Sequence, residues 1–180
     1  MKIKKIIGLI ILLSQLFLNS SLADYPETKI GVIDLNFILS ESKAAEDAAK
    51  QIEKIAIEIE EEIKKSDQEL VDEQNELIES QQIMAPAVFD EKRKEYEKKV
   101  QNYNITRQEK LVSIDMLVSD SRNEVLNALK PILEELSNQK GITVLLEKNS
   151  VLLNAENMDI TKDALKLLNK ELPSIEVSLD

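Results

Sequence analysis

Residues 142–161 read ITVLLEKNSVLLNAENMDIT, and this stretch determines which fold the chain can adopt. Two short apolar runs, ITVLL and VLL, flank residues 147–150, a pattern that predicts the two strands of a hairpin. A lone two-stranded hairpin is only marginally stable in water, so a further strand is needed. The segment KIGVIDL at 29–35 has a similar apolar pattern and supplies that strand, although residues 36–141 lie between the two.

The intervening residues have the composition of long helices. Residues 43–84 contain no Gly and no Pro, and good helix formers dominate them. The motif APA at 85–87 interrupts this pattern, because proline lacks an amide hydrogen and clashes with the preceding turn. A second helix is predicted over about 90–138, with a kink at Pro131 and with Gly141 as the left-handed residue that ends it.

Apolar residues repeat at steps of three and four in both helices, which predicts that the helices pack as an antiparallel hairpin. In this register the numbers of facing residues sum to about 173, and apolar positions match along the whole length. The predicted apolar pairs are Met84–Phe89, Leu77–Tyr96, Leu70–Tyr103, Ile63–Leu111, Ile59–Ile114 and Ala56–Val118, and the predicted ion pairs are Glu76–Lys98 and Glu79–Lys94.

This predicted seam weakens toward the tip of the hairpin. Polar residues interrupt it at Ser66, Glu73 and Ser80. In the second helix, one extra residue breaks the regular repeat of seam positions before Leu111 and Val118. One apolar pair per turn buries too little surface to offset much of the entropy lost on ordering. We therefore expect the distal part of the hairpin to be flexible.

Residues 1–23 have the pattern of a secretory signal peptide. A positive start, MKIKK, precedes an apolar stretch too short for a stable membrane span, and small residues precede a cleavage site between Ala23 and Asp24. An uncleaved N-terminal anchor helix is the alternative interpretation. Cleavage would leave a mature domain, residues 24–180, that is soluble in the periplasm, and the absence of Cys excludes a lipid-anchored precursor.

The composition argues against an enzyme and against a bound metal or cofactor. The sequence has no His and no Cys, so it lacks imidazole bases, thiol nucleophiles and the usual zinc ligands. Its acids fall in runs such as EIEEE at 58–62, which indicate a solvated helix face rather than two carboxylates held in a cleft. The signal peptide holds three lysines and no acid, so the mature chain carries 20 basic against 34 acidic residues. This balance argues against binding of nucleic acid or anionic lipid.

Together these elements predict an α+β fold, in which a small three-stranded β body carries a long helical hairpin as a projecting arm. The body comprises residues 28–42 and 139–175, with a short helix at about 162–171, and the arm comprises residues 43–138. Such a body has a small core and exposed sheet edges, so self-association of several chains into a closed ring is expected. The candidates for contacts between chains, or for a core within one chain, are Ile30, Val32, Ile142, Val144, Leu146, Val151 and Leu153.

The order of these segments resembles the Skp-type (OmpH-like) periplasmic chaperones. The likeness covers residues 28–175, and its most specific parts are GVIDLNFI at 31–38 and DIT at 159–161, followed by Leu165 and Leu168. The resemblance implies a homotrimer with a β-barrel body and three helical tentacles. These would enclose a cavity that holds unfolded outer-membrane proteins during transit through the periplasm. It also implies no ATP, no cofactor and no catalytic residue.

The chain departs from this family in its charge. Well-known members are basic, and their positive tentacles are thought to attract acidic clients and lipopolysaccharide. This chain is acidic and has only three Arg, which argues against lipopolysaccharide binding. A basic patch remains near the tip, at 92–94 and 98–99, and its simplest interpretation is a solvated face that pairs with acids across the hairpin.

The distal arm offers candidates for contact with an unfolded client, which requires many weak and adaptable apolar contacts. Phe89, Tyr96 and Tyr103 recur every seven residues there, and further apolar residues surround the turn. For the two tyrosines, filling of the hairpin seam is the simpler interpretation. The client-binding candidates are Ile83, Met84, Val88, Phe89, Tyr96 and Tyr103.

Two other functions fit parts of the pattern. A structural coiled-coil spacer or adaptor of the cell envelope would need a stiff seam up to the tip, and the polar interruptions argue mildly against it. A cytosolic prefoldin-like chaperone would share the arm but not the signal peptide.

Overall fold

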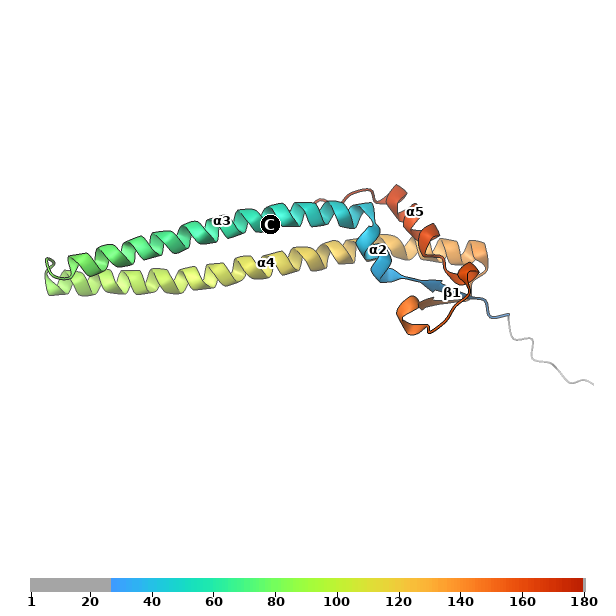
Figure 1. The fold of residues 1–180 in the computed structure, drawn as a ribbon, viewed down its shortest axis with the longest axis horizontal. Helices are drawn as coiled ribbons and strands as arrows, with labels where there is room; N and C mark the ends of the chain where they lie inside the picture. The colour runs from blue at the N-terminus through green and yellow to red at the C-terminus, as the bar shows by residue number, and fades with distance from the viewer. Residues whose placement is uncertain (1–26, 180) are drawn as a thin grey trace, which may run out of the picture.

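The computed structural model describes residues 27–179, so the predicted signal peptide and its cleavage site at Ala23 and Asp24 lie outside the described residues. Two long helices form an arm that projects from a small body (Figure 1). No helix in this part of the chain is long and apolar enough to cross a membrane. The elements are β1 (Ile30–Ile33), α2 (Leu35–Glu41), α3 (Lys43–Ser80), α4 (Pro86–Lys140), β2 (Val144–Glu147), the 3₁₀ turns η2 (Lys148–Ser150) and η3 (Glu156–Met158), and α5 (Thr161–Glu171).

The two arm helices begin and end where local signals place them. Ser42 caps α3, because its hydroxyl oxygen accepts a hydrogen bond from the amide of Ala45 at 3.3 Å. The predicted break at 85–87 is present, but α4 begins at Pro86 rather than at residue 90, since a missing amide hydrogen costs nothing in the first turn. Gly141 ends α4 with φ of 67°, as predicted, and α4 continues through Pro131.

The seam of the arm differs from the prediction in its second half. The half-buried residues of α4 keep a spacing of seven through Tyr96, Tyr103, Lys110 and Leu117, so the predicted extra residue does not come before Leu111. It comes later, before Val125, which is buried as predicted. The ammonium of Lys110 forms an ion pair with Glu62 of α3, which allows a lysine to occupy a seam position. The predicted seam residues Leu111 and Val118 are instead exposed, at 42% and 51%.

The sheet has two parallel strands, and the predicted three-stranded body with a hairpin at 142–153 is wrong. β1 pairs with β2 in the register Ile30↔Val144 to Ile33↔Glu147. The strands are parallel because α4 returns the chain to the start of β1, where the carbonyl of Lys29 accepts a hydrogen bond from the amide of Thr143 at 2.8 Å. After β2 the chain turns through η2, so Leu152 and Leu153 are exposed and form no strand. The other edge of β1 forms a single bridge between Val32 and Asp159.

The core of the body lies where α2, α4 and α5 meet beneath β1. α4 reaches beyond the arm into the body and contributes Leu129, Ile132 and Leu136. The core therefore unites segments from both ends of the chain, and the same helix that forms the arm supports the body. Its other buried members include Ile33, Ile38, Ala44, Ala48, Val125, Ile160, Ala164, Leu168 and Ile175.

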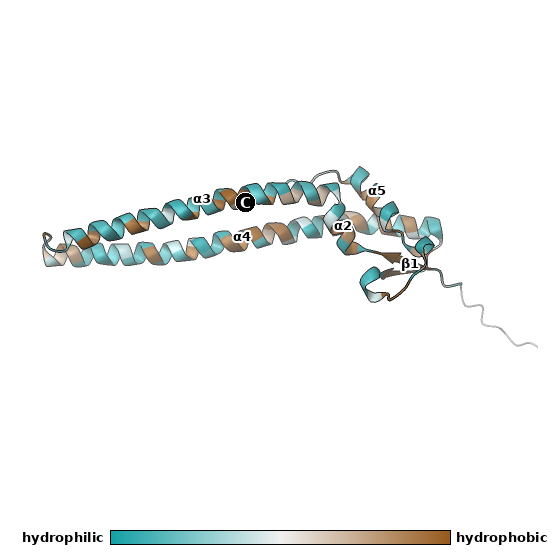
Figure 2. Ribbon diagram, viewed as in Figure 1, coloured by the Kyte–Doolittle hydropathy of each residue, from teal (hydrophilic) through white to brown (hydrophobic). Residues whose placement is uncertain are grey.

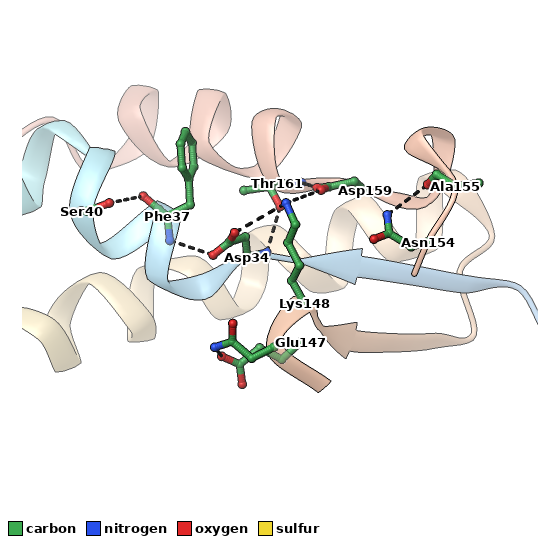
Figure 3. Close-up of polar contacts among 10 residues, drawn as sticks. Asp34, Phe37, Ser40, Glu147, Lys148, Asn154, Ala155, Asp159 and Thr161 are labelled. Atoms are coloured by element: carbon green, nitrogen blue, oxygen red, sulfur yellow. Dashed lines mark hydrogen bonds and ion pairs between the residues drawn. The ribbon is translucent and has the colours of Figure 1, made fainter. Parts of the chain in front are cut away.

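A small polar network joins the end of β1 to the start of α5 (Figure 3). The amide of Asp34 donates to the hydroxyl of Thr161 at 2.9 Å, and the amide of Thr161 donates to the carboxylate of Asp159 at 2.9 Å. The ammonium of Lys148 lies 3.3 Å from Asp159 and 3.6 Å from Asp34. Burial raises the pKa of Asp159, but hydrogen bonds from Thr161 and Lys148 outweigh burial and hold this pKa below its ordinary value.

The residues after α5 return to the arm and pack against its base. We call residues 173–179 the C-terminal strap. Within it, Ile175 is buried at 3% exposure. The side chain of Gln51 on α3 binds the strap at two points, because it donates to the carbonyl of Ile175 at 2.6 Å and accepts from the amide of Val177 at 3.1 Å. The strap thus connects the body to the arm in addition to α3 and α4.

Candidate functional site

The tip of the arm presents apolar side chains to solvent. Residues 81–85 form the turn between α3 and α4, held by a hydrogen bond from the amide of Met84 to the carbonyl of Ser80 at 3.0 Å. Within the tip, Ile83 is 87% exposed and Val88 is also exposed. Met84 and Phe89 are half-buried at the end of the seam. The tip therefore has accessible apolar surface on a short and poorly packed piece of chain.

The two arm tyrosines lie in the seam between the helices. Both Tyr96 and Tyr103 are half-buried, and the hydroxyl of Tyr103 hydrogen-bonds the carboxylate of Asp67 on α3. Burial, followed by the bond to Asp67, raises the pKa of Tyr103. This placement matches the simpler interpretation of these residues, in which they hold the two arm helices together.

Ion pairs cross the arm at positions different from those predicted. The structure forms Lys99–Glu73 and Lys110–Glu62, whereas Glu76–Lys98 and Glu79–Lys94 are not ion pairs within residues 27–179. The numbers of the observed pairs sum to 172, so facing polar residues are shifted by one or two positions from the predicted pairs. Lys94 and Lys98 therefore remain on the exposed surface of α4.

The arm also exposes apolar residues outside its seam. Figure 2 shows hydrophobic positions recurring along both arm helices, interspersed among hydrophilic ones. At the base they border an apolar hollow of about 460 Å³, lined in part by Leu39, Ala49, Ile52 and Val118. The sequence prediction placed Leu111 and Val118 of this surface in the seam and gave the other exposed residues no role. The exposed apolar residues of the arm between its base and its tip are Ile57, Val71, Ile78, Ile105, Leu111, Val112, Met116 and Val118.

The candidate body residues divide into two groups. Val32 is 1% exposed, and Ile142 packs over Gly31, where an added Cβ would lie 2.8 Å from its Cδ1 atom. These two residues belong to the interior of the single chain, and Val151 is half-buried. The others are exposed, and Leu152, which sequence reasoning missed, joins them. The exposed group is Ile30, Val144, Leu146, Leu152 and Leu153.

The outer edge of β2 is open, and Val144 and Leu146 on this strand expose apolar side chains. β2 pairs with β1 on one side, and the described residues provide no strand on its other side. An unpaired strand edge with apolar side chains can accept a strand from another chain. Within residues 27–179, no cluster of acids has the geometry to hold a metal ion.

Comparison with known proteins relates this architecture to one family. A family model described as outer membrane protein (OmpH-like) matches residues 29–168. Among solved structures, the chain is similar to a candidate outer membrane chaperone (OmpH-like) from Caulobacter crescentus, with 14% sequence identity and a TM-score of 0.77. That match covers 87% of this chain and 94% of the other, and at this identity it shows the fold. No curated protein sequence matches the chain.

Proposed function

Since the chain belongs to the OmpH-like family of outer membrane proteins, we propose that it is an ATP-independent holding chaperone of the periplasm. It binds unfolded outer-membrane proteins between helical arms and prevents their aggregation. The observation that carries this proposal is the arm itself, which is long and thin and has apolar side chains exposed at its tip and along its length. Such a surface suits unfolded chains better than it suits a small ligand, because it is extended and has no enclosed cleft.

The chemistry of the arm supports holding rather than tight docking. Its exposed apolar residues are spaced out among charged ones, so each offers a small and separate contact. Many weak contacts along a flexible arm can adapt to clients of different sequence and can release them without an energy source. The seam supports this adaptability, since lysine and serine occupy positions that a stiff coiled coil would fill with leucine.

A cavity between arms requires more than one chain. We propose that the open edge of β2 and the exposed apolar side chains near it, Ile30, Val144, Leu146 and Leu153, join the bodies of a homotrimer. Association would cover these apolar side chains and supply β2 with the partner that the single chain lacks. It would also place several arms side by side around a shared space.

The mass of the oligomer tests the proposal directly. The experiment is light scattering of the mature protein, residues 24–180, alone and with an unfolded outer-membrane barrel protein. We expect a trimer that keeps one barrel protein soluble per oligomer. A monomer or dimer that leaves the client to aggregate would contradict the proposal and favour a structural adaptor of the cell envelope.

The role of the tip is tested by replacing Ile83, Met84, Val88 and Phe89 together with Ser. We expect weaker suppression of client aggregation and an unchanged oligomer mass, since the turn between α3 and α4 lies at the end of the arm far from the body (Figure 1). The matched control replaces Gln81, Gln82, Lys92 and Lys94 with Ser, which alters the same region without removing apolar surface. Equal client holding by the two variants would exclude the tip as a contact site.

A further inference from the structure

A basic hollow lies on the body of this acidic chain. Lys162, Lys166 and Lys170 form one row along α5, and Lys43 in the first turn of α3 completes the rim. The side chain of Phe37, which is 41% exposed, lines the hollow between them. We call these five residues and Leu165 the lysine hollow. It has a volume of about 610 Å³ and combines α5 with the consecutive helices α2 and α3, which are distant from α5 in sequence.

The lysine hollow is held in shape by backbone and side-chain contacts. The side-chain oxygen of Asn169 accepts a hydrogen bond from the amide of Lys43 at 2.8 Å, which fixes the row on α5 against the start of α3. The amide of Phe37 donates to Asp34 at 2.9 Å and anchors the first turn of α2. The positions of the rim are therefore set by the fold rather than by the lysines themselves.

The four lysines of the hollow form no ion pair with any carboxylate in residues 27–179. The nearby acid Asp163 is already bound by Lys140 at 2.7 Å. The full chain has 34 acids against 23 basic residues, so most surfaces offer a lysine an acidic neighbour. Four lysines at one place without an ion-pair partner in residues 27–179 indicate a surface that is complementary to an external anion.

We propose that the lysine hollow binds an extended acidic segment of a partner protein. Successive lysines of the α5 row are four residues apart, which corresponds to about 6 Å along a helix. Alternate residues of an extended chain lie about 6.6 Å apart on one face, so acids at every second position can meet the row in register. An apolar side chain of the same segment can pack on Phe37 and Leu165.

A peptide fits this site better than a membrane surface does. A membrane presents its negative charge over the whole face of the protein, and the net charge of −11 opposes that approach. A short peptide is influenced mainly by charges within a Debye length, about 8 Å at physiological ionic strength. A peptide seated in the hollow lies closest to the four lysines of its rim. The inference is independent of the proposed chaperone function, because direct binding measures it.

The test uses a fluorescein-labelled peptide with Glu at alternate positions and one central Phe, titrated with the full mature chain. Replacement of Lys162, Lys166 and Lys170 with Glu should weaken binding by about tenfold or more, since three charge contacts are reversed. The matched control replaces Lys92, Lys94 and Lys98 with Glu, which changes the net charge equally at the far end of the arm. This control should change the affinity less than about twofold, because those sites lie beyond the screening range. Phe37→Ser, which leaves the charge intact, should also weaken binding.

Four outcomes would overturn the proposal. Equal weakening by the two triple variants would show unspecific charge attraction, and equal binding of a peptide with its Glu residues in one block would remove the register argument. If the triple variant at Lys162, Lys166 and Lys170 no longer bound phosphatidylglycerol vesicles but still bound the peptide as the unmodified protein does, the hollow would be assigned to a membrane. A changed oligomer mass of this triple variant would assign the hollow to contacts between copies of the chain. Circular dichroism of each variant confirms that the body remains folded.

Discussion

Gly141 is the residue at which the chain leaves the arm and enters the sheet. Its φ of 67° lies in the left-handed region, which a side chain disfavours, and an added Cβ would meet no atom within 4 Å. The cost of a substitution here is therefore purely conformational. We expect Gly141→Ala to lower the free energy of unfolding by about 1 kcal/mol. Gly141→Asn should cost less, since Asn tolerates this conformation better. Urea unfolding of both variants measures the difference, and equal losses would contradict this explanation.

Asp159 links three segments of the body, and its charge is the feature that a pH titration can test. Its folded pKa is lowered from the ordinary value of 3.8, so the stabilisation is present above this value and is lost as the pH falls through the folded pKa. Asp159→Asn should therefore unfold more easily at pH 7, by about 1–2 kcal/mol. The difference from the unmodified protein should shrink as the pH falls below about 4.

Urea unfolding of Asp159→Asn at several pH values gives this comparison. Glu156→Gln, on the neighbouring and exposed η3 turn, is the matched control and should show no such pH dependence. A constant difference between Asp159→Asn and the unmodified protein at all pH values would show that the charge of Asp159 is not what stabilises the network.

At the scale of the element, the seam of α4 keeps a spacing of seven from Tyr96 to Leu117. Leu117 is half-buried against α3, whereas Leu111, one turn and a half away, is exposed. Leu117→Ser should therefore destabilise the arm by about 1–2 kcal/mol, and Leu111→Ser should change its stability by less than about 0.5 kcal/mol. Hydrogen exchange of the amides in α3 and α4 measures both effects. A larger loss of stability in Leu111→Ser than in Leu117→Ser would instead support the predicted seam, which contains Leu111.

The helices were predictable because their signals are local, and their repeats predicted that α3 packs antiparallel to α4. The individual partners in the seam and the direction of strand pairing were not predictable. Helix-forming composition, Pro86 and Gly141 determine where helices start and stop, and each acts within one or two turns. The seam positions at Lys110 and Leu117 were not predictable, because Lys110 counts as polar although an acid on α3 partners it. The apolar run at Leu152 and Leu153 reads as a strand, but the single chain provides it with no neighbour.

The candidate sites also differ in whether local sequence signals were enough to predict them. The tip residues could be proposed from sequence because they surround one turn, and their exposure supports that proposal. The lysine hollow could not, since α2, α3 and α5 each contribute to it and only the fold brings them together. An isolated row of three lysines on a short helix is common and carries no information about Phe37 or Lys43.

At the scale of the whole molecule, the C-terminal strap controls how firmly the arm is attached to the body. Gln51 is its main polar anchor, and Gln51→Ala removes both hydrogen bonds to the strap. We expect faster proteolysis of residues 173–179 and faster hydrogen exchange in the first half of α3, with a loss of stability of about 1 kcal/mol. Gln139→Ala removes a single hydrogen bond within α4 and serves as the matched control. Identical protease sensitivity of the two variants would show that Ile175 alone holds the strap.

The pairing of β1 with β2 also determines the order in which the chain can fold. The contact between Lys29 and Thr143 spans 114 positions, and closing a flexible loop of that length costs roughly 4 kcal/mol from its length-dependent term. Once α3 and α4 have paired, the arm brings the two strands together and most of this entropy has already been lost. We expect the arm to form first and the sheet last. During synthesis, β1 then remains unpaired until α4 is complete. The nascent chain can therefore misassemble through this strand.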